Sequence, residues 1–195
     1  MNIVVLGDTG MIGSRAVTEA KNRGHRVTGY SRNGENTLDF SDTSKVVEII
    51  DDPKTDVTII AVVSGRTGSY EDDVANHTAL INAAPTGRML VVGGAGALQI
   101  DENTLLVESP DFPEIYKAES QTFAAIHQAY ADAADLNWTM LAPAPEIAPG
   151  ERTGQYKIGK DYPAGASISA EDFVVALIDE AENPQHTGTR FTVAN

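Results

Sequence analysis

The sequence predicts an α/β fold in which helices cover both faces of a doubly wound parallel sheet. Apolar, β-branched runs alternate with segments of helical periodicity, and this alternation is typical of βαβ units with right-handed crossovers. Residues 57–63 form an apolar run, as expected for a parallel strand buried on both faces. A chain of 195 residues has the length of a single domain.

The order of the elements follows from the hydrophobic pattern. The first strand, at 2–6, ends in glycine, and a helix follows in which Ile12, Ala16, Val17 and Ala20 share one face. Further strands are predicted at 25–30, 57–63, 89–92, 138–141 and 190–193, and further helices at 43–50, 73–83 and 115–134.

The two C-terminal helices have the clearest apolar faces. In the helix at 115–134, the helical spacing of five side chains predicts a core face made of Ile115, Phe123, Ile126, Tyr130 and Ala133. In the last helix, Ser169 and Asp172 have the spacing of a capping box. Its predicted buried face consists of Phe173, Leu177, Ile178 and Ala181, and Pro184 follows its end.

Two stretches, 93–114 and 143–166, lack regular periodicity. Each follows a predicted strand and should therefore emerge at the carboxyl edge of the sheet, where open α/β folds bind ligands. We expect both stretches to form the substrate walls of a single domain that spans residues 1–195.

Composition excludes several classes of function. The net charge of −14 argues against nucleic acid as a partner, because such binding depends on basic residues that neutralise phosphates. No apolar run has the length of a membrane span, and no signal peptide precedes the first strand, so a cytoplasmic protein without a membrane partner is expected. There is no cysteine, and the four histidines lack metal-ligand spacing, so no metal site is predicted.

The segment from Gly7 to Gly13 has the spacing G-x-x-G-x-x-G and lies between a predicted strand and a predicted helix. This context is the one that a dinucleotide-binding fingerprint requires. Glycine permits a sharp turn and a close approach of the backbone to a pyrophosphate, and a helix N-terminus attracts the anion. The segment therefore predicts a Rossmann fold that binds a nicotinamide dinucleotide.

The residues after the second strand indicate which nicotinamide cofactor is preferred. An acid there would bind the ribose hydroxyls of NAD, whereas this chain has Tyr30, Ser31 and Arg32. Because an arginine makes forked bonds to phosphate, NADP(H) is favoured over NAD(H). Arg15 is a further candidate for the phosphate. Asp39 is expected either near the adenine amine or in a turn or capping role.

The sequence offers only weak candidates for catalysis. Tyr116 and Lys117 are adjacent and so point about 100° apart on a helix, whereas the tyrosine and lysine of short-chain dehydrogenases lie four residues apart on one face. They are not that pair, although Tyr116 stays a candidate. Glu146 is the other: it could transfer a proton near the substrate, or be an exposed loop acid.

Besides the glycine segment, the chain has recognisable motifs along its whole length, at 91–98, 137–139, 143, 149–154, 167–172 and 190–193. With them the chain resembles the NADH-flavin reductases within the NAD(P)-binding, NmrA-like branch of the atypical short-chain dehydrogenases. Biliverdin-IXβ reductase, itself a flavin reductase, is a more distant relative. That enzyme has a serine near the reacting centre, whereas this chain has Ala95 and lacks the hydroxyl.

The resemblance implies a set of cofactor contacts. Gly7, Thr9, Gly10, Met11 and Ile12 would surround the pyrophosphate, and Ser31 and Arg32 would meet the adenosine ribose and its phosphate. Close to the adenine and its ribose would lie Val62, Val63 and Ser64, and close to the nicotinamide Gly93, Gly94, Ala95 and Pro143.

Two functions fit these features. The first is an NAD(P)H-dependent reductase that transfers a hydride to a flavin or quinone-like planar acceptor, a reaction that positioning alone can accelerate. The alternative is an NmrA-like sensor that binds NADP(H) without turnover. A homodimer, or a protein partner in the case of a sensor, is the expected association. Epimerase or dehydratase chemistry is disfavoured because the chain is short and its tyrosine and lysine are wrongly spaced.

Overall fold

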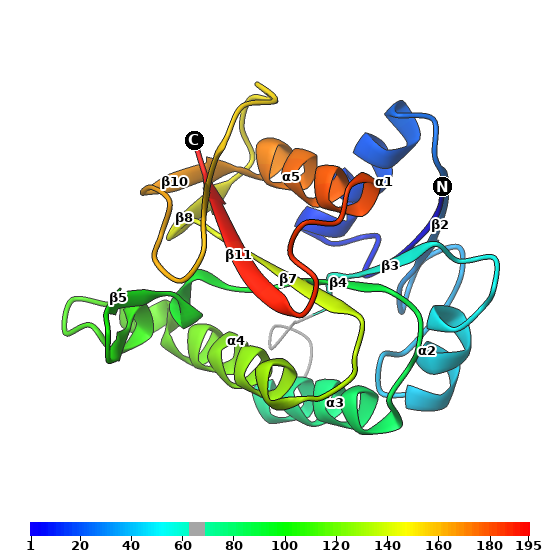
Figure 1. The fold of residues 1–195 in the computed structure, drawn as a ribbon, viewed down its shortest axis with the longest axis horizontal. Coiled ribbons are helices and arrows are strands. Elements are labelled where there is room, and N and C mark those ends of the chain that lie inside the picture. The colour runs from blue at the N-terminus through cyan, green and yellow to red at the C-terminus, as the bar shows by residue number, and fades with distance from the viewer. Residues whose placement is uncertain (63–68) are drawn as a thin grey trace.

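The computed structural model describes residues 1–62 and 69–195 and has a seven-stranded sheet between two layers of helices (Figure 1). The sheet has the order β2-β1-β3-β4-β7-β11-β9. Its strands are β1 (Asn2–Leu6), β2 (Arg26–Tyr30), β3 (Val57–Ile60), β4 (Met89–Val92), β7 (Trp138–Pro143), β9 (Lys157–Gly159) and β11 (Thr189–Ala194). The expected doubly wound α/β sheet is therefore present.

The sheet is parallel except at one edge. Strand β9 pairs antiparallel with β11, with Val193 opposite Ile158. This strand was not predicted from the sequence, because three residues are too few to show a period of two. An antiparallel edge strand on an otherwise parallel sheet is a common arrangement in this fold class.

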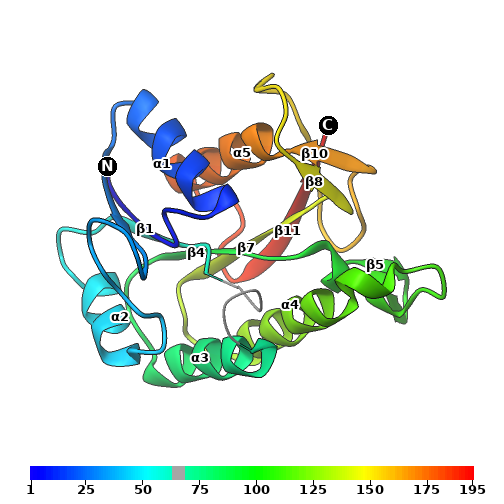
Figure 2. The same ribbon diagram turned by 180° about the vertical axis from the view of Figure 1, so that it is seen from behind.

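The helices divide between the two faces of the sheet, as Figures 1 and 2 show. Helices α1 (Met11–Asn22) and α5 (Ala170–Glu182) pack side by side on one face. The other face carries α2 (Thr43–Ile50), α3 (Tyr70–Ala83) and α4 (Glu114–Asp132). Side chains alternate accordingly along β1, where Ile3 and Val5 belong to the core beneath α1 and α5 and Val4 and Leu6 to the opposite core.

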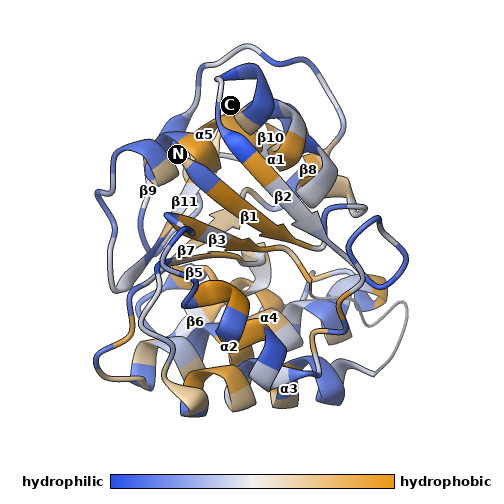
Figure 3. Ribbon diagram, turned by 90° about the vertical axis from the view of Figure 1, so that its right-hand side faces the viewer, coloured by the Kyte–Doolittle hydropathy of each residue, from blue (hydrophilic) through white to orange (hydrophobic). Residues whose placement is uncertain are grey.

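The hydropathy of the elements matches these layers. Figure 3 shows apolar strands between the helices and apolar helix faces turned towards them. On α5, the predicted face of Phe173, Leu177, Ile178 and Ala181 is buried. Within the described part of the chain, no helix has the length and apolar character needed to cross a membrane.

Two predictions for α4 and β3 need correction. Ile115 was expected in the core but has 83% of its surface exposed, because it lies in the first turn of α4, which begins at Glu114. Strand β3 ends at Ile60, earlier than predicted, and Val63 lies outside the described residues. Ile126 and Tyr130 are buried as expected.

The expected capping box at α5 is half formed. The Ser169 hydroxyl accepts a hydrogen bond from the Asp172 N–H at 3.0 Å, whereas the Ser169 N–H donates to Asn195. The Asp172 carboxylate instead accepts bonds from the N–H groups of Thr153 and Gly154, at 2.8 and 2.7 Å. The Asp172 carboxylate therefore holds the loop before β9 rather than the end of its own helix.

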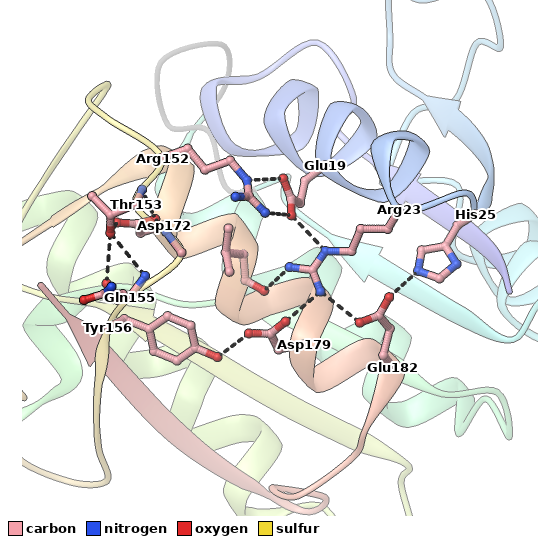
Figure 4. A network of polar contacts seen from close by, with 12 residues as sticks. Glu19, Arg23, His25, Arg152, Thr153, Gln155, Tyr156, Asp172, Asp179 and Glu182 are labelled. Carbon is pink, nitrogen blue, oxygen red and sulfur yellow. Dashed lines mark hydrogen bonds and ion pairs between the residues drawn. The ribbon is translucent and has the colours of Figure 1, made fainter.

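The stretch predicted at 143–166 as a substrate wall divides into two parts. Residues 143–147 and Ala166 line a cleft at the carboxyl edge of the sheet. Residues between them turn away to pack on α1 and α5, where Arg152 binds Glu19 and Tyr156 donates to Asp179 at 2.5 Å (Figure 4). Two short strands, β8 (Glu146–Ala148) and β10 (Ser167–Ser169), flank these residues in the chain and pair with each other in parallel.

Glu19 is the centre of the network in Figure 4. Its carboxylate, 4% exposed, accepts two bonds from Arg152 at 2.8 and 2.7 Å and one from Arg23 at 2.8 Å. Arg23 continues the network to Asp179 and Glu182 on α5. The bond from Arg152, together with Arg23, lowers the pKa of Glu19 to about 2, against the effect of burial. The network ties α1 to α5 and to the 150–156 segment.

We expect Glu19→Gln to lower the free energy of unfolding by about 2 kcal/mol at pH 7, because two guanidinium groups lose their shared carboxylate. Since the pKa of Glu19 is lowered in the folded state, its stabilisation is complete above the unfolded-state pKa and is lost as the pH falls towards about 2. Urea unfolding at pH 7 and pH 3 should therefore show the difference from wild type shrinking at the lower pH. The exposed Glu48→Gln is the control, and an equal effect of the two substitutions at pH 7 would contradict this role.

Candidate functional site

The site begins where the direction of winding reverses. Strands β2 and β3 flank β1 on opposite sides, and such a switch point is where open α/β sheets bind ligands. Gly7 follows β1 with φ +89°, and its N–H donates to Tyr30 O at 2.7 Å. A Cβ at Gly7 would lie 2.2 Å from Ala61 O, and one at Gly13 would lie 2.1 Å from Gly7 O. Both positions therefore require glycine.

The glycine segment leads into the N-terminus of α1. Its N-cap, Gly10, has no side chain to cap the helix, whereas Asp42, Ser69 and Ser169 cap α2, α3 and α5. The first-turn amides of α1 are left for a ligand, and no acidic residue stands in that turn. Free N–H groups and the positive end of the helix dipole form an anion site.

A cleft of 1640 Å³ extends from this point along the carboxyl edge of the sheet. The residues after β1, β2, β3, β4 and β7 all contribute to its walls. Every predicted cofactor residue in the described part of the chain lines it: Gly7, Thr9, Gly10, Met11, Ile12, Ser31, Arg32, Asp39, Val62, Gly93, Gly94, Ala95 and Pro143. Val63 and Ser64 lie outside the described residues. The structure thus brings the predicted set together at one surface.

At the end of the cleft beside β2, charged and turn-forming residues are packed together. Asp39 accepts hydrogen bonds from the N–H and hydroxyl of Ser41, at 3.0 and 2.8 Å. These bonds, with a smaller effect of Arg32, hold the pKa of Asp39 below its ordinary value. Asp39 therefore has the turn role that was one of its two alternatives, at a position that also lines the cleft.

Arg15, a further candidate for the phosphate, binds other residues of the chain. Its Nε donates to Glu171 at 2.7 Å and its Nη1 to Met11 O at 2.9 Å, so it ties α1 to α5. It does not line the cleft. Asp8, within the glycine segment, was not among the residues predicted for this site. Its carboxylate lies against β2, where a Cβ at Gly29 would be 2.2 Å from the Asp8 Oδ2. The two glycines that pack against this carboxylate, Gly29 and Gly34, are the feature of the sequence that could have indicated its position.

The wall near Phe40 rests on a buried aromatic cluster. The Phe40 ring lies 4.9 Å from that of His77, which lies 5.8 Å from Tyr130. Burial lowers the pKa of His77 to about 3, and its Nδ1 is 3.2 Å from the Tyr130 hydroxyl. His77 is thus a neutral core residue that supports the cleft wall.

The other end of the cleft is built from the turn after β4. This turn contains the 3-10 helix η1 (Ala95–Ala97) and packs closely on α4. A Cβ at Gly94 would lie 2.4 Å from the Phe123 ring, and one at Gly96 would lie 2.4 Å from Ser120. Arg190, which is 5% exposed, donates a hydrogen bond from Nη1 to Ala97 O, and its Nη2 lies 3.5 Å from Asp161 Oδ1. These contacts fix the backbone around Ala95.

Both catalytic candidates lie on the cleft wall. Tyr116, in the first turn of α4, is 55% exposed. Glu146, at the start of β8, is also exposed. Lys117 does not line the cleft, and its Nζ is 3.5 Å from Glu114. Tyr116 and Lys117 thus point in different directions, as their adjacency requires.

The fold and this cleft define a dinucleotide-binding protein of the Rossmann class. A family model described as NAD(P)H-binding matches residues 7–184. The chain belongs to this NAD(P)H-binding family. Among curated proteins, it is similar to the uncharacterized protein YwnB of Bacillus subtilis, with 30% identity over 210 residues that cover all of this chain and 99% of that protein.

Solved structures show the same fold over the whole chain. One, called a "putative NADH-flavin reductase", from Streptococcus pneumoniae, has a TM-score of 0.88 and 28% identity and covers 100% of this chain and 99% of its own. Another, called a "putative exported protein", from Burkholderia pseudomallei, has a TM-score of 0.88 and 34% identity with complete coverage of both chains. A third, called a "putative epimerase", from Bacteroides thetaiotaomicron, has a TM-score of 0.86 and 30% identity, covering 99% and 96%.

Proposed function

We propose that this protein is an NAD(P)H-dependent oxidoreductase that transfers a hydride to a flavin or quinone-like planar acceptor. The observation that carries the proposal is the continuity of the cleft. It joins the glycine segment and the α1 N-terminus to a second end walled by Phe112, Tyr116 and Phe123. A dinucleotide laid along the first part would bring its reactive ring to the second.

The residues of the first part fit such a cofactor. The uncapped α1 N-terminus would hold the pyrophosphate, and Gly7 and Gly13 leave the backbone clear of side chains. Arg32 would meet a 2′-phosphate, which favours NADP(H) over NAD(H). Gly93, Gly94 and Ala95 would form the surface beneath the nicotinamide, on a turn that α4 and Arg190 hold in place.

The reaction requires positioning more than acid or base catalysis. The reduced nicotinamide, when bound, supplies a hydride, that is two electrons and one proton, and the acceptor takes up a second proton that originates in the solvent. The chain's own contribution is to orient the two flat rings and to exclude water between them. Tyr116 and Glu146 stay candidates for delivering the second proton, because both line the cleft.

Arg32→Ala tests the cofactor assignment. We expect it to weaken NADPH binding about 10- to 100-fold and NADH binding less than about threefold, because the guanidinium would contact only the 2′-phosphate. Isothermal titration calorimetry with each nucleotide measures both affinities. Arg26→Ala, an exposed position on β2 that does not line the cleft, is the control. Equal losses for the two nucleotides would contradict the assigned role.

Turnover and binding measurements on the same protein distinguish a reductase from a sensor. A reductase oxidises NADPH in the presence of riboflavin, FMN or a quinone above the uncatalysed rate. A sensor of the NmrA-like type shows no turnover but binds the reduced and oxidised nucleotides with markedly different affinities. A cytoplasmic location is part of the proposal, and fractionation of cells that produce the protein tests it.

A further inference from the structure

The acceptor end of the cleft carries an unusual charge pattern. We define this end by its lining residues on 106–123 and 143–147 and by Ala166 and Phe173. Three carboxylates line it: Asp111 before α4 and Glu119 on α4, both from 106–123, and Glu146 on β8. None of the lining residues described at this end is a lysine or an arginine.

Asp111, Glu119 and Glu146 are set apart by their place at the acceptor end, since the other acids that line the cleft, Asp39, Asp72 and Asp73, lie outside that end. Asp39 is satisfied by Ser41, and Glu171 beneath the glycine segment is paired with Arg15. In the part of the chain that the structure describes, Asp111, Glu119 and Glu146 have neither an ion pair nor a side-chain hydrogen bond. Because all three line the cleft and their charge is not neutralised within the described chain, they give this end a negative potential, which salt screens where the carboxylates are exposed.

The rest of the acceptor end is mainly apolar, with Ser109 and Ser120 as its other polar lining residues. Phe112, Phe123 and the exposed Tyr116 contribute rings, and Pro113, Pro145 and Ile147 complete the walls. Aromatic surfaces of this kind stack on flat rings. The walls therefore attract an aromatic molecule, while the three carboxylates repel anions.

We propose that the acceptor is a flat aromatic molecule without negative charge, and that Asp111, Glu119 and Glu146 exclude acceptors that carry a phosphate. This inference rests on the proposed function, since it concerns the second substrate of the same cleft. It separates flavins that share one reactive ring: riboflavin and lumiflavin are uncharged, whereas FMN carries a phosphate. An anionic nucleotide already bound in the cleft would increase the discrimination.

The test compares riboflavin with FMN by two measurements. The first is kcat/KM with saturating NADPH, and the second is the affinity measured by quenching of flavin fluorescence. Both should favour riboflavin about tenfold at low ionic strength, and the preference should fall below about threefold at 0.5 M salt, because salt screens exposed charges. Lumiflavin should behave like riboflavin, which controls for the ribityl chain.

Charge-neutralising variants locate the effect. Asp111→Asn combined with Glu119→Gln should bring the riboflavin-to-FMN ratio towards one in both measurements. Asp135→Asn combined with Glu48→Gln removes the same charge at exposed positions away from the cleft and should leave the ratio at the wild-type value. The double change avoids Glu146, whose loss could also affect proton transfer.

The outcomes distinguish the two claims. FMN used and bound as well as riboflavin, or a preference that persists at high salt or in the cleft variant, overturns the charge inference alone. No turnover with any flavin or quinone overturns the proposed reductase function. In that case the binding ratio still decides whether this end of the cleft rejects anions.

Discussion

Gly7→Ala should lower the affinity for the nicotinamide nucleotide at least about 100-fold, measured by calorimetry, while much of the sheet persists. The methyl group would lie 2.2 Å from Ala61 O, and φ at this position is +89°. The glycine loop or the end of β3 must therefore move, which displaces the α1 amides from an anion bound between them.

Gly24→Ala is a matched control for the backbone strain. Gly24 also has positive φ, +84°, but a Cβ there would meet nothing within 4 Å. It should cost about 1 kcal/mol of stability and leave nucleotide affinity within about twofold. Circular dichroism establishes that both variants are folded. A folded Gly7→Ala protein that binds like wild type would show that the loop does not cradle the nucleotide.

Asp172→Ala should lower the free energy of unfolding by about 3 kcal/mol. The carboxylate, 0% exposed, accepts four hydrogen bonds, from Thr153 N, Gly154 N, the Thr153 hydroxyl and the Asn195 amide. Burial alone would raise the pKa of Asp172, but the bonds from Thr153, Gly154 and Asn195 hold it below its ordinary value. Removing it leaves buried donors without an acceptor.

Urea unfolding at pH 7 measures this loss. Asp42→Ala is the control, because Asp42 caps α2 at an exposed position and its removal should cost about 1 kcal/mol. Because the pKa of Asp172 is lowered, its stabilising effect should weaken as the pH falls below the unfolded-state value. A loss below 1 kcal/mol at pH 7 would mean that the 153–154 loop is held by other contacts.

The order and type of the long elements were predictable from the sequence because each has a clear period. The β1–α1 unit and the apolar face of α5 are set by local pattern, and the structure places them within one or two residues of the prediction. The glycine segment was also readable, since Gly7 and Gly13 are required by contacts that lie close in the chain or across one strand.

What was missed depends on contacts between distant segments. The edge strand β9 forms because β11 offers it a partner. Arg15 does not line the cleft because it binds Glu171, which lies 156 positions away in the chain. The exposure of Ile115 follows from where α4 begins, which helical spacing alone does not define. The acceptor end has no local motif, because its walls come from segments that lie far apart in the chain.

Calorimetric titration of the wild-type protein with NADPH and NADH tests most directly whether the cleft is a dinucleotide site. We expect one nucleotide to bind per chain, with a dissociation constant of about 10 μM or less for NADPH and weaker binding of NADH. If neither nucleotide binds at millimolar concentration, the cleft along the carboxyl edge is not a dinucleotide site, and the proposed oxidoreductase function fails with it.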